Sequence, residues 1–78
     1  MYYAYFARCA DGSLYAGYTN DIKNREAVHN AGEGARYTRG RLPIKIVYFE
    51  KFKTRSAAMK REYALKKMKK EDKEALLI

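Results

Sequence analysis

The chain has 78 residues and a mass of 9.1 kDa, which leaves room for one small domain spanning 1–78. Hydrophobic residues make up 47% and charged residues 33% of the sequence, so a disordered chain and a large multidomain enzyme are both excluded. Lys and Arg number 17 against 9 Asp and Glu, which gives a net charge of +8. So strong a positive field on a small body favours a polyanionic partner, above all nucleic acid.

The start of the chain has neither the pattern of a membrane span nor that of a secretory signal. The apolar run over residues 2–7 is too short to cross a bilayer, and no basic region precedes it. Cys9 is the single cysteine, so an internal disulfide is excluded, which suits a reducing compartment. No stretch combines a wide apolar face with a basic one, which disfavours a membrane partner. We therefore expect a cytoplasmic protein.

The first 18 residues predict a β-hairpin. Residues 2–9 are rich in strand-forming side chains, and Gly12 can provide the positive φ of a tight turn before a second strand over residues 14–18. A three-residue loop formed by residues 11–13 would place Tyr5 and Tyr15 on the same face of the sheet.

The rest of the chain predicts helices and one further strand. Residues 19–21 offer N-caps for a first helix that Gly32 ends, and Ser56 can cap a second. The predicted fold is α+β, a small three-stranded antiparallel sheet flanked by helices in the order β-β-α-β-α-α. The expected segments after the hairpin are a helix over 22–31, a loop over 32–43, an alternating strand over 44–52, a helix over 56–69 and a short helix over 71–77.

The first helix carries an unusual combination of polar side chains. Ile22, Arg25, Glu26 and His29 share one face, because they lie at i, i+3, i+4 and i+7. Arg25 and His29 then lie beside the buried stripe and are candidates for chemistry. The alternative is a surface array of Arg25 and Glu26 with a solvated His29.

The second helix places a carboxylate where an apolar residue is expected. Glu62 falls on a stripe with Ala58 and Leu65, and a partly buried carboxylate must be paired, hydrogen-bonded or bound to a cation. An internal ion pair with Arg25 is one interpretation. The other is a metal site, since one carboxylate with several waters can hold Mg²⁺ when a substrate phosphate completes the shell.

Several motifs together resemble the GIY-YIG nuclease domain. Nine residues separate residues 3–5 (Tyr-Ala-Tyr) from residues 15–17 (Tyr-Ala-Gly), as in that family's paired signature. Residues 20–25 followed by His29 match the family's first helix, and residues 58–62 match the helix that carries its metal-binding glutamate. The resemblance covers almost the whole chain and is strongest to the short, stand-alone bacterial branch.

Two motif positions depart from the family pattern. The first Gly-Ile is Tyr3-Ala4 here, and the isoleucine of the second motif is Ala16. Both are packing positions in the sheet, so we expect them to change the fit more than the chemistry. Gly17 is kept, and a side chain there would crowd the neighbouring strand or an approaching backbone.

The resemblance implies hydrolysis of nucleic-acid phosphodiesters with one divalent ion, Mg²⁺ or Mn²⁺. By the matching positions, Tyr15 would be the general base or the partner that activates water, and Tyr5 would orient that water or the phosphate. Arg25 would stabilise the pentacovalent phosphate, and His29 would relay a proton or bind the phosphate. Glu62 would hold the metal. Ordinary sheet aromatics remain the alternative for the two tyrosines.

Two basic segments are candidates for nucleic-acid binding. The Gly-flanked loop after the first helix could clamp a phosphate backbone, with its tyrosine stacked on a base, or it could be a solvated connector. The lysine run at the end of the second helix could attract phosphates or simply be a solvated helix end. The candidates are Arg36, Tyr37, Thr38, Arg39, Arg41, Lys66 and Lys67.

Two functions remain after these observations. The first is a metal-dependent endonuclease acting on nucleic acid, DNA more than RNA. The second is a non-catalytic or partner-activated nucleic-acid-binding module on the same fold. A protein partner or a weak dimer is compatible with both, since a small hydrolase needs two sites to cut two strands.

Overall fold

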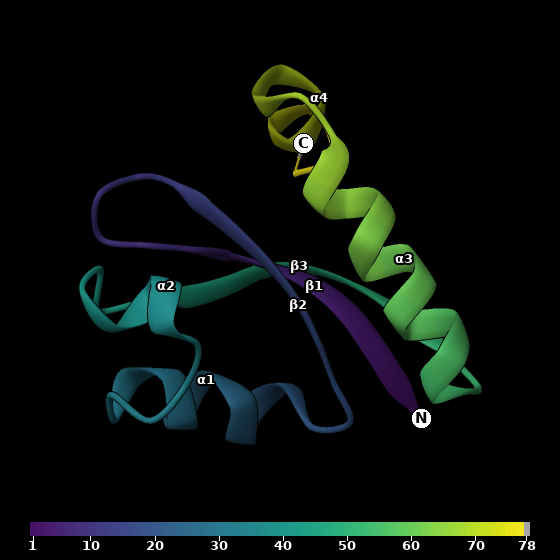
Figure 1. Ribbon diagram of the computed structural model, residues 1–78, viewed down its shortest axis with the longest axis horizontal. Helices are drawn as coiled ribbons and strands as arrows, with labels where there is room; N and C mark the ends of the chain where they lie inside the picture. The colour runs from purple at the N-terminus through teal and green to yellow at the C-terminus, as the bar shows by residue number, and fades with distance from the viewer. Residues whose placement is uncertain (78) are drawn as a thin grey trace.

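The computed structural model describes residues 1–77, which form one sheet with helices on both of its faces (Figure 1). The strands are β1 (Tyr2–Arg8), β2 (Leu14–Thr19) and β3 (Lys45–Phe52), and the helices are α1 (Ile22–Asn30), α2 (Arg36–Arg39), α3 (Arg55–Lys67) and α4 (Lys70–Ala75). All neighbouring strands are antiparallel, and the order across the sheet is β2-β1-β3. The predicted fold class and element order are therefore confirmed, with α2 as a short addition inside the expected loop.

The hairpin between β1 and β2 has the predicted loop length but a different position. The amide of Cys9 donates to the carbonyl of Ser13 at 2.9 Å, so the three loop residues are 10–12 and not 11–13. Gly12 has a φ of 86°, a left-handed conformation that costs glycine no steric strain. The register pairs Tyr5 with Gly17 and Ala7 with Tyr15, which places the two tyrosines on one face as predicted.

A β-bulge divides β3 into two parts that face opposite sides. The register between β1 and β3 shifts between Phe6 and Ala7, which pair with Tyr48 and Ile46. Because a one-residue shift reverses the side-chain alternation, Ile46 joins the core under α1, whereas Tyr48 joins the core under α3. The sequence expectation that residues 44–52 alternate on one continuous face is therefore wrong.

Each face of the sheet has its own core. The α3 side buries Ala4, Phe6, Ala16 and Leu65. The α1 side buries Tyr5, Ala7, Cys9 and Ile44. Figure 1 shows α3 and α4 on one side of the sheet and α1 and α2 on the other. The candidate site residues therefore come from elements on both faces.

The helix ends follow the capping rules, although one cap differs from the prediction. Asp21 caps α1 by accepting from the amide of Asn24 at 3.1 Å. Thr54, and not Ser56, caps α3 by accepting from the amide of Ala57 at 3.1 Å. The helix consequently begins one residue before Ser56, because Thr54 has the extended backbone that a cap requires.

Two side chains of α1 bind backbone groups at the start of β3. Asn30 bonds both backbone groups of Ile44, accepting at 2.7 Å and donating at 3.0 Å. Glu26 accepts from the amide of Ile46 at 2.8 Å. Glu26 is thus used to hold α1 on the sheet, and the predicted surface array with Arg25 does not form. This attachment fixes the helix that carries Arg25 and His29.

The C-terminal helix is tied to the sheet by an ion pair. Arg8 of β1 contacts Glu74 of α4 through two parallel bonds of 2.6 Å. In residues 1–77, no helix is both long and apolar enough to cross a membrane.

Candidate active site

A chain of hydrogen bonds begins at Tyr5 and runs through His29 to Thr38. The Thr38 hydroxyl donates to the carbonyl of Ala35 at 2.8 Å, so its oxygen must accept from Nδ1 of His29, also at 2.8 Å. Nε2 of the neutral imidazole is then an acceptor, and the Tyr5 hydroxyl donates to it at 2.9 Å. The Thr38 hydroxyl thus determines which group donates and which accepts in each of these hydrogen bonds.

The three hydrogen-bonded side chains are fully buried, and burial determines the protonation states of Tyr5 and His29. Burial raises the pKa of Tyr5 from 10.0 to about 12, although the nearby Arg25 acts in the opposite direction. Burial also lowers the pKa of His29 below 6.5, and the charge of Arg25 lowers it further. At neutral pH the pair is therefore a phenol and a neutral imidazole. The alternative of a solvated His29 is wrong.

Two glycines make room for this chain. A Cβ at Gly17 would collide with the hydroxyl of Tyr5, so the ring can lie over β2 only because residue 17 has no side chain. A Cβ at Gly34 would collide with Nδ1 of His29 in the same way. The glycine of the second motif thus serves the tyrosine of the first motif.

Tyr15 is the more accessible tyrosine and is held by aromatic neighbours. Its ring is half-buried and lies 5.6 Å from the His29 ring and 6.5 Å from the Tyr5 ring, centroid to centroid. Tyr37 of α2 stacks on Tyr15 with centroids 5.8 Å apart and planes inclined by 23°. Of the two tyrosines, only Tyr15 retains exposed surface at which water or substrate can approach.

Arg41 contacts Tyr37 and restrains its position on Tyr15. Its guanidinium carbon lies 3.9 Å from the centroid of the Tyr37 ring, and Nη1 donates to the Tyr37 carbonyl at 2.7 Å. Nε of the same group donates to Asp11 of the hairpin loop at 3.0 Å. The hairpin and α2 are thereby joined through one side chain beside Tyr15.

Arg25 and Glu62 bring charge to the same place. Both charges act on the Tyr5 hydroxyl: the charge of Arg25 lowers the pKa of Tyr5, and the charge of Glu62 raises it. Nε of Arg25 is buried without a hydrogen-bond partner among residues 1–77, and its ion pair with Glu62 does not form. Glu62 instead contacts Lys66, one helical turn later, at 3.6 Å.

The donor set suits only a loosely coordinated metal ion. In the described part of the chain, no group of three or more His, Cys, Asp or Glu side chains could together hold an ion. The Glu62 side chain is 19% exposed, so its carboxylate can coordinate an ion at the surface of the site. One carboxylate with water fits Mg²⁺ or Mn²⁺, which keep several waters, and does not fit a closed structural site.

The residues predicted to bind nucleic acid separate into two groups. Thr38 is buried on His29, and both Tyr37 and Arg41 are engaged with each other beside Tyr15. The others lie exposed on the surface of α2 or α3: Arg36, Arg39, Lys66 and Lys67. Thr38 therefore belongs to the interior of the site and not to a binding surface.

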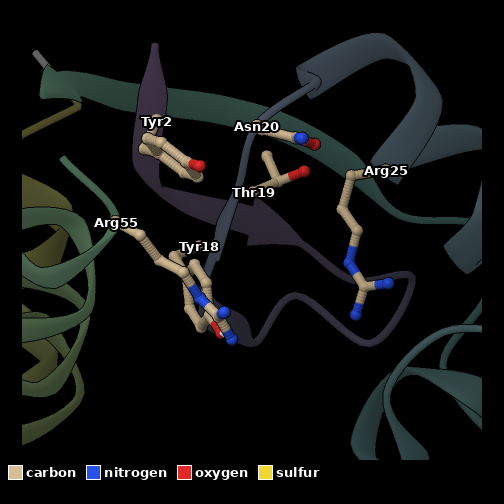
Figure 2. Close-up of a pocket in the computed structure, with 6 residues that line it drawn as sticks. All are labelled: Tyr2, Tyr18, Thr19, Asn20, Arg25 and Arg55. Atoms are coloured by element: carbon tan, nitrogen blue, oxygen red, sulfur yellow. Dashed lines mark hydrogen bonds between the residues drawn. The ribbon is translucent and has the colours of Figure 1, made fainter. Parts of the chain in front are cut away.

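Sequence reasoning missed three participants in and around the site. The sequence indicates Asp11 only as a turn residue, although its carboxylate accepts from Arg41. No motif marks Tyr18 or Arg55, yet Arg55 donates to the Tyr18 hydroxyl at 3.0 Å in a cleft that Arg25 also lines (Figure 2). Their 37-residue separation gives no local signal in a single sequence.

Comparison with protein families matches the GIY-YIG catalytic domain over residues 1–75. The chain belongs to the GIY-YIG family. Membership implies nuclease-type chemistry. The structure brings Tyr5, Tyr15 and His29 together, and the catalytic roles that the resemblance implies for them and for Arg25 stay predictions.

The most similar relatives of this GIY-YIG protein include bacterial and archaeal proteins. A UPF0213 protein of Haloquadratum walsbyi is 53% identical over 75 residues, which is 96% of this chain and 84% of that protein. A UPF0213 protein of Listeria monocytogenes is 49% identical over 77 residues, or 99% of this chain and 86% of that protein.

Two solved structures share the fold. The solution NMR structure of a UPF0213 protein from Bacillus halodurans has a TM-score of 0.61 and 42% identity, covering 99% of this chain and 83% of that chain. A protein from E. faecalis, also solved by NMR, has a TM-score of 0.59 and 44% identity, covering 96% and 81% of the two chains. The GIY-YIG sheet and helices described above therefore have solved counterparts.

Proposed function

We propose that this protein is a metal-dependent endonuclease that hydrolyses phosphodiester bonds of nucleic acid, with DNA as its principal substrate. The observation that supports this most is the convergence of Tyr15, Arg25 and Glu62 around the buried Tyr5–His29 pair. Phosphodiester hydrolysis depends on charge neutralisation and in-line positioning, and this arrangement supplies groups for both.

Arg25 is the group that binds the reacting phosphate. A guanidinium contacts two phosphate oxygens at once, and the negative charge that develops in the pentacovalent state strengthens these bonds. The Nε of Arg25 is buried without a hydrogen-bond partner among residues 1–77, so no carboxylate in this part of the chain neutralises the charge at this atom.

Tyr15 is the group that receives the attacking water. Water attacks phosphorus while one of its protons passes to the phenolate oxygen of Tyr15, the bond from phosphorus to the leaving oxygen breaks, and the leaving oxygen takes a proton from solvent water. Only the phenolate form of a tyrosine can accept a proton from water, so this role requires Tyr15 to react in that form. Tyr5 and His29 are fully buried, so in place of the roles that the resemblance implies, orienting the water or the phosphate and relaying a proton, they hold the Tyr15 ring and the α1 helix in position.

Glu62 is the residue that would hold Mg²⁺ or Mn²⁺. When bound, the ion neutralises charge on the phosphate oxygens and on the leaving group. The neighbouring Lys66 is the only ion-pair partner of Glu62 among residues 1–77, and this exposed contact is weak enough for an ion to replace.

A cleavage panel tests the proposal. Single-stranded, duplex, flap and branched DNA and RNA are each incubated with Mg²⁺, Mn²⁺ or EDTA, and Glu62→Ala protein is purified in parallel to expose contaminating nucleases. We expect metal-dependent cleavage by the wild type that the variant loses. Salt-sensitive binding without cleavage would contradict the nuclease and support a binding or partner-activated module.

Binding should also depend steeply on salt. With a net charge of +8, the logarithm of the affinity should fall against the logarithm of salt with a slope that corresponds to about four to six phosphates. A slope near zero would mean that the basic surface does not contact the ligand.

A further inference from the structure

A cationic cleft extends from Arg25, at the candidate active site, to Arg55. Its volume is about 440 Å³, within the range of pockets that hold a small ligand or one nucleotide. It lies between the end of β2 and the first residues of α1 and α3, as Figure 2 shows. The residues that line it are Tyr2, Tyr18, Thr19, Asn20, Arg25 and Arg55.

The cleft has two guanidinium groups and no acidic lining. Arg25 and Arg55 approach it from different helices, with Thr19 and Asn20 between them (Figure 2). Neither arginine pairs with a carboxylate in residues 1–77, whereas Arg8 does. An anion would neutralise these two unpaired cations, and the side-chain amide of Asn20 between them can donate hydrogen bonds to it, whereas the Thr19 hydroxyl already donates to the Asp21 carbonyl at 3.3 Å.

The side chain of Arg55 is restrained by a contact with Tyr18. Its guanidinium donates to the Tyr18 hydroxyl at 3.0 Å and lies 5.7 Å from the centroid of that ring. This single contact restrains a long side chain while leaving other donors of the planar group able to bind oxygen atoms. A ligand therefore loses less free energy to ordering the arginine than it would at an unrestrained side chain.

We propose that Arg55, positioned by Tyr18, binds the backbone phosphate next to the phosphate that is cleaved. The inference rests on the proposed function, in which Arg25 takes the reacting phosphate. The next phosphate of the same strand then falls on the Arg55 side of the cleft, with Thr19 and Asn20 beside the intervening sugar.

A binding experiment in EDTA tests the subsite without any cleavage. A short fluorescent oligonucleotide is titrated by anisotropy at several salt concentrations with wild type, Arg55→Ala, Tyr18→Phe and the control Lys45→Ala. Lys45 is exposed and lies at the opposite end of the sheet, where β3 pairs with Arg8. We expect Arg55→Ala to weaken binding about tenfold and to lower the salt slope by about one phosphate, with a smaller loss for Tyr18→Phe and little change for the control.

A neutral linkage locates the contact. A series of oligonucleotides carries a single methylphosphonate, each at a different linkage. At one linkage the substitution should weaken binding by the wild type as much as Arg55→Ala does. At the same linkage it should cause no further loss of binding by the Arg55→Ala protein. With cleavage measured in Mg²⁺, this position should adjoin the cut, and Arg55→Ala should raise KM while kcat changes little, because the contact is equal in ground and transition states.

The outcomes separate the subsite from the nuclease. If Arg55→Ala behaves like Lys45→Ala, or if every methylphosphonate weakens the variant as much as the wild type, the subsite is overturned even when the protein cleaves. If the wild type never cleaves but one linkage depends on Arg55, the nuclease fails and the phosphate subsite is supported. Thermal melts confirm that the exposed substitutions leave the fold intact.

Discussion

The Tyr5 hydroxyl donates to Nε2 of His29 at 2.9 Å, and both side chains are fully buried. Tyr5 comes from the central strand and His29 from the last turn of α1, so this bond joins the sheet to the helix that carries Arg25. A buried polar pair of this kind is stable only while every donor and acceptor has a partner. Its remaining partner, Thr38, is therefore as important as the pair itself.

Thr38→Val should disturb the site through its direct contact with His29. The substitution removes the acceptor for Nδ1–H of His29, and an unsatisfied buried group costs about 1–3 kcal/mol of the free energy of unfolding. Thr38→Ser keeps the hydroxyl and should restore the hydrogen bond. The ¹⁵N shifts of the imidazole, the only one in the chain, report the tautomer directly. An unchanged Nδ1–H tautomer in Thr38→Val would show that Thr38 does not fix it.

The stability of the protein should depend on pH through His29. Its pKa is lowered by burial in the folded state and is near 6.5 in the unfolded chain, so the unfolded state binds more protons below this value. The stabilisation by neutral His29 is fully present above pH 6.5 and is lost as pH falls through the folded pKa. Urea unfolding between pH 5 and 7.5 should show this slope. A His29→Gln variant that kept the full slope would assign the titration to another group.

Gly17→Ala should destabilise the protein and displace Tyr5. The new methyl group would meet the Tyr5 hydroxyl, and overpacking of this kind costs about 1–3 kcal/mol. Gly40→Ala is the matched control, because nothing lies within 4 Å of a Cβ there and its φ of −91° suits alanine. We expect the control to change the free energy of unfolding by less than about 1 kcal/mol. Equal melting temperatures for the two variants would contradict the role assigned to Gly17.

Tyr15→Phe and Arg25→Ala should abolish cleavage while the fold stays intact. Tyr15 retains its ring and its stacking on Tyr37 as phenylalanine, so only the hydroxyl is lost. Tyr63→Phe is the control, because that tyrosine is 60% exposed on the outer face of α3. Cleavage rates and circular dichroism are measured together. If either site variant unfolds, the residue is structural and the catalytic role assigned to it is wrong.

Local sequence information indicated most of the elements, whereas the candidate site residues came from the matching motifs of the family resemblance and stay predictions. Strand-forming runs, Gly12, Gly32 and the capping residues mark where each element begins or ends, and these signals act within a few residues. The spacing of Tyr5 from Tyr15 and of Arg25 from His29 follows from the periods of strand and helix. Both tyrosines consequently lie on one face, as expected.

The tertiary structure alone decided burial, hydrogen-bond partners and the new cleft. No local pattern indicates the bulge that turns Ile46 and Tyr48 to opposite faces, because a bulge depends on how β3 meets β1. The bond from His29 to Thr38 crosses a loop whose path is set by packing. Arg55 reaches Tyr18 only because α3 packs against β2. These contacts join residues distant in sequence, so they depend on how the elements pack together, which local propensities do not specify.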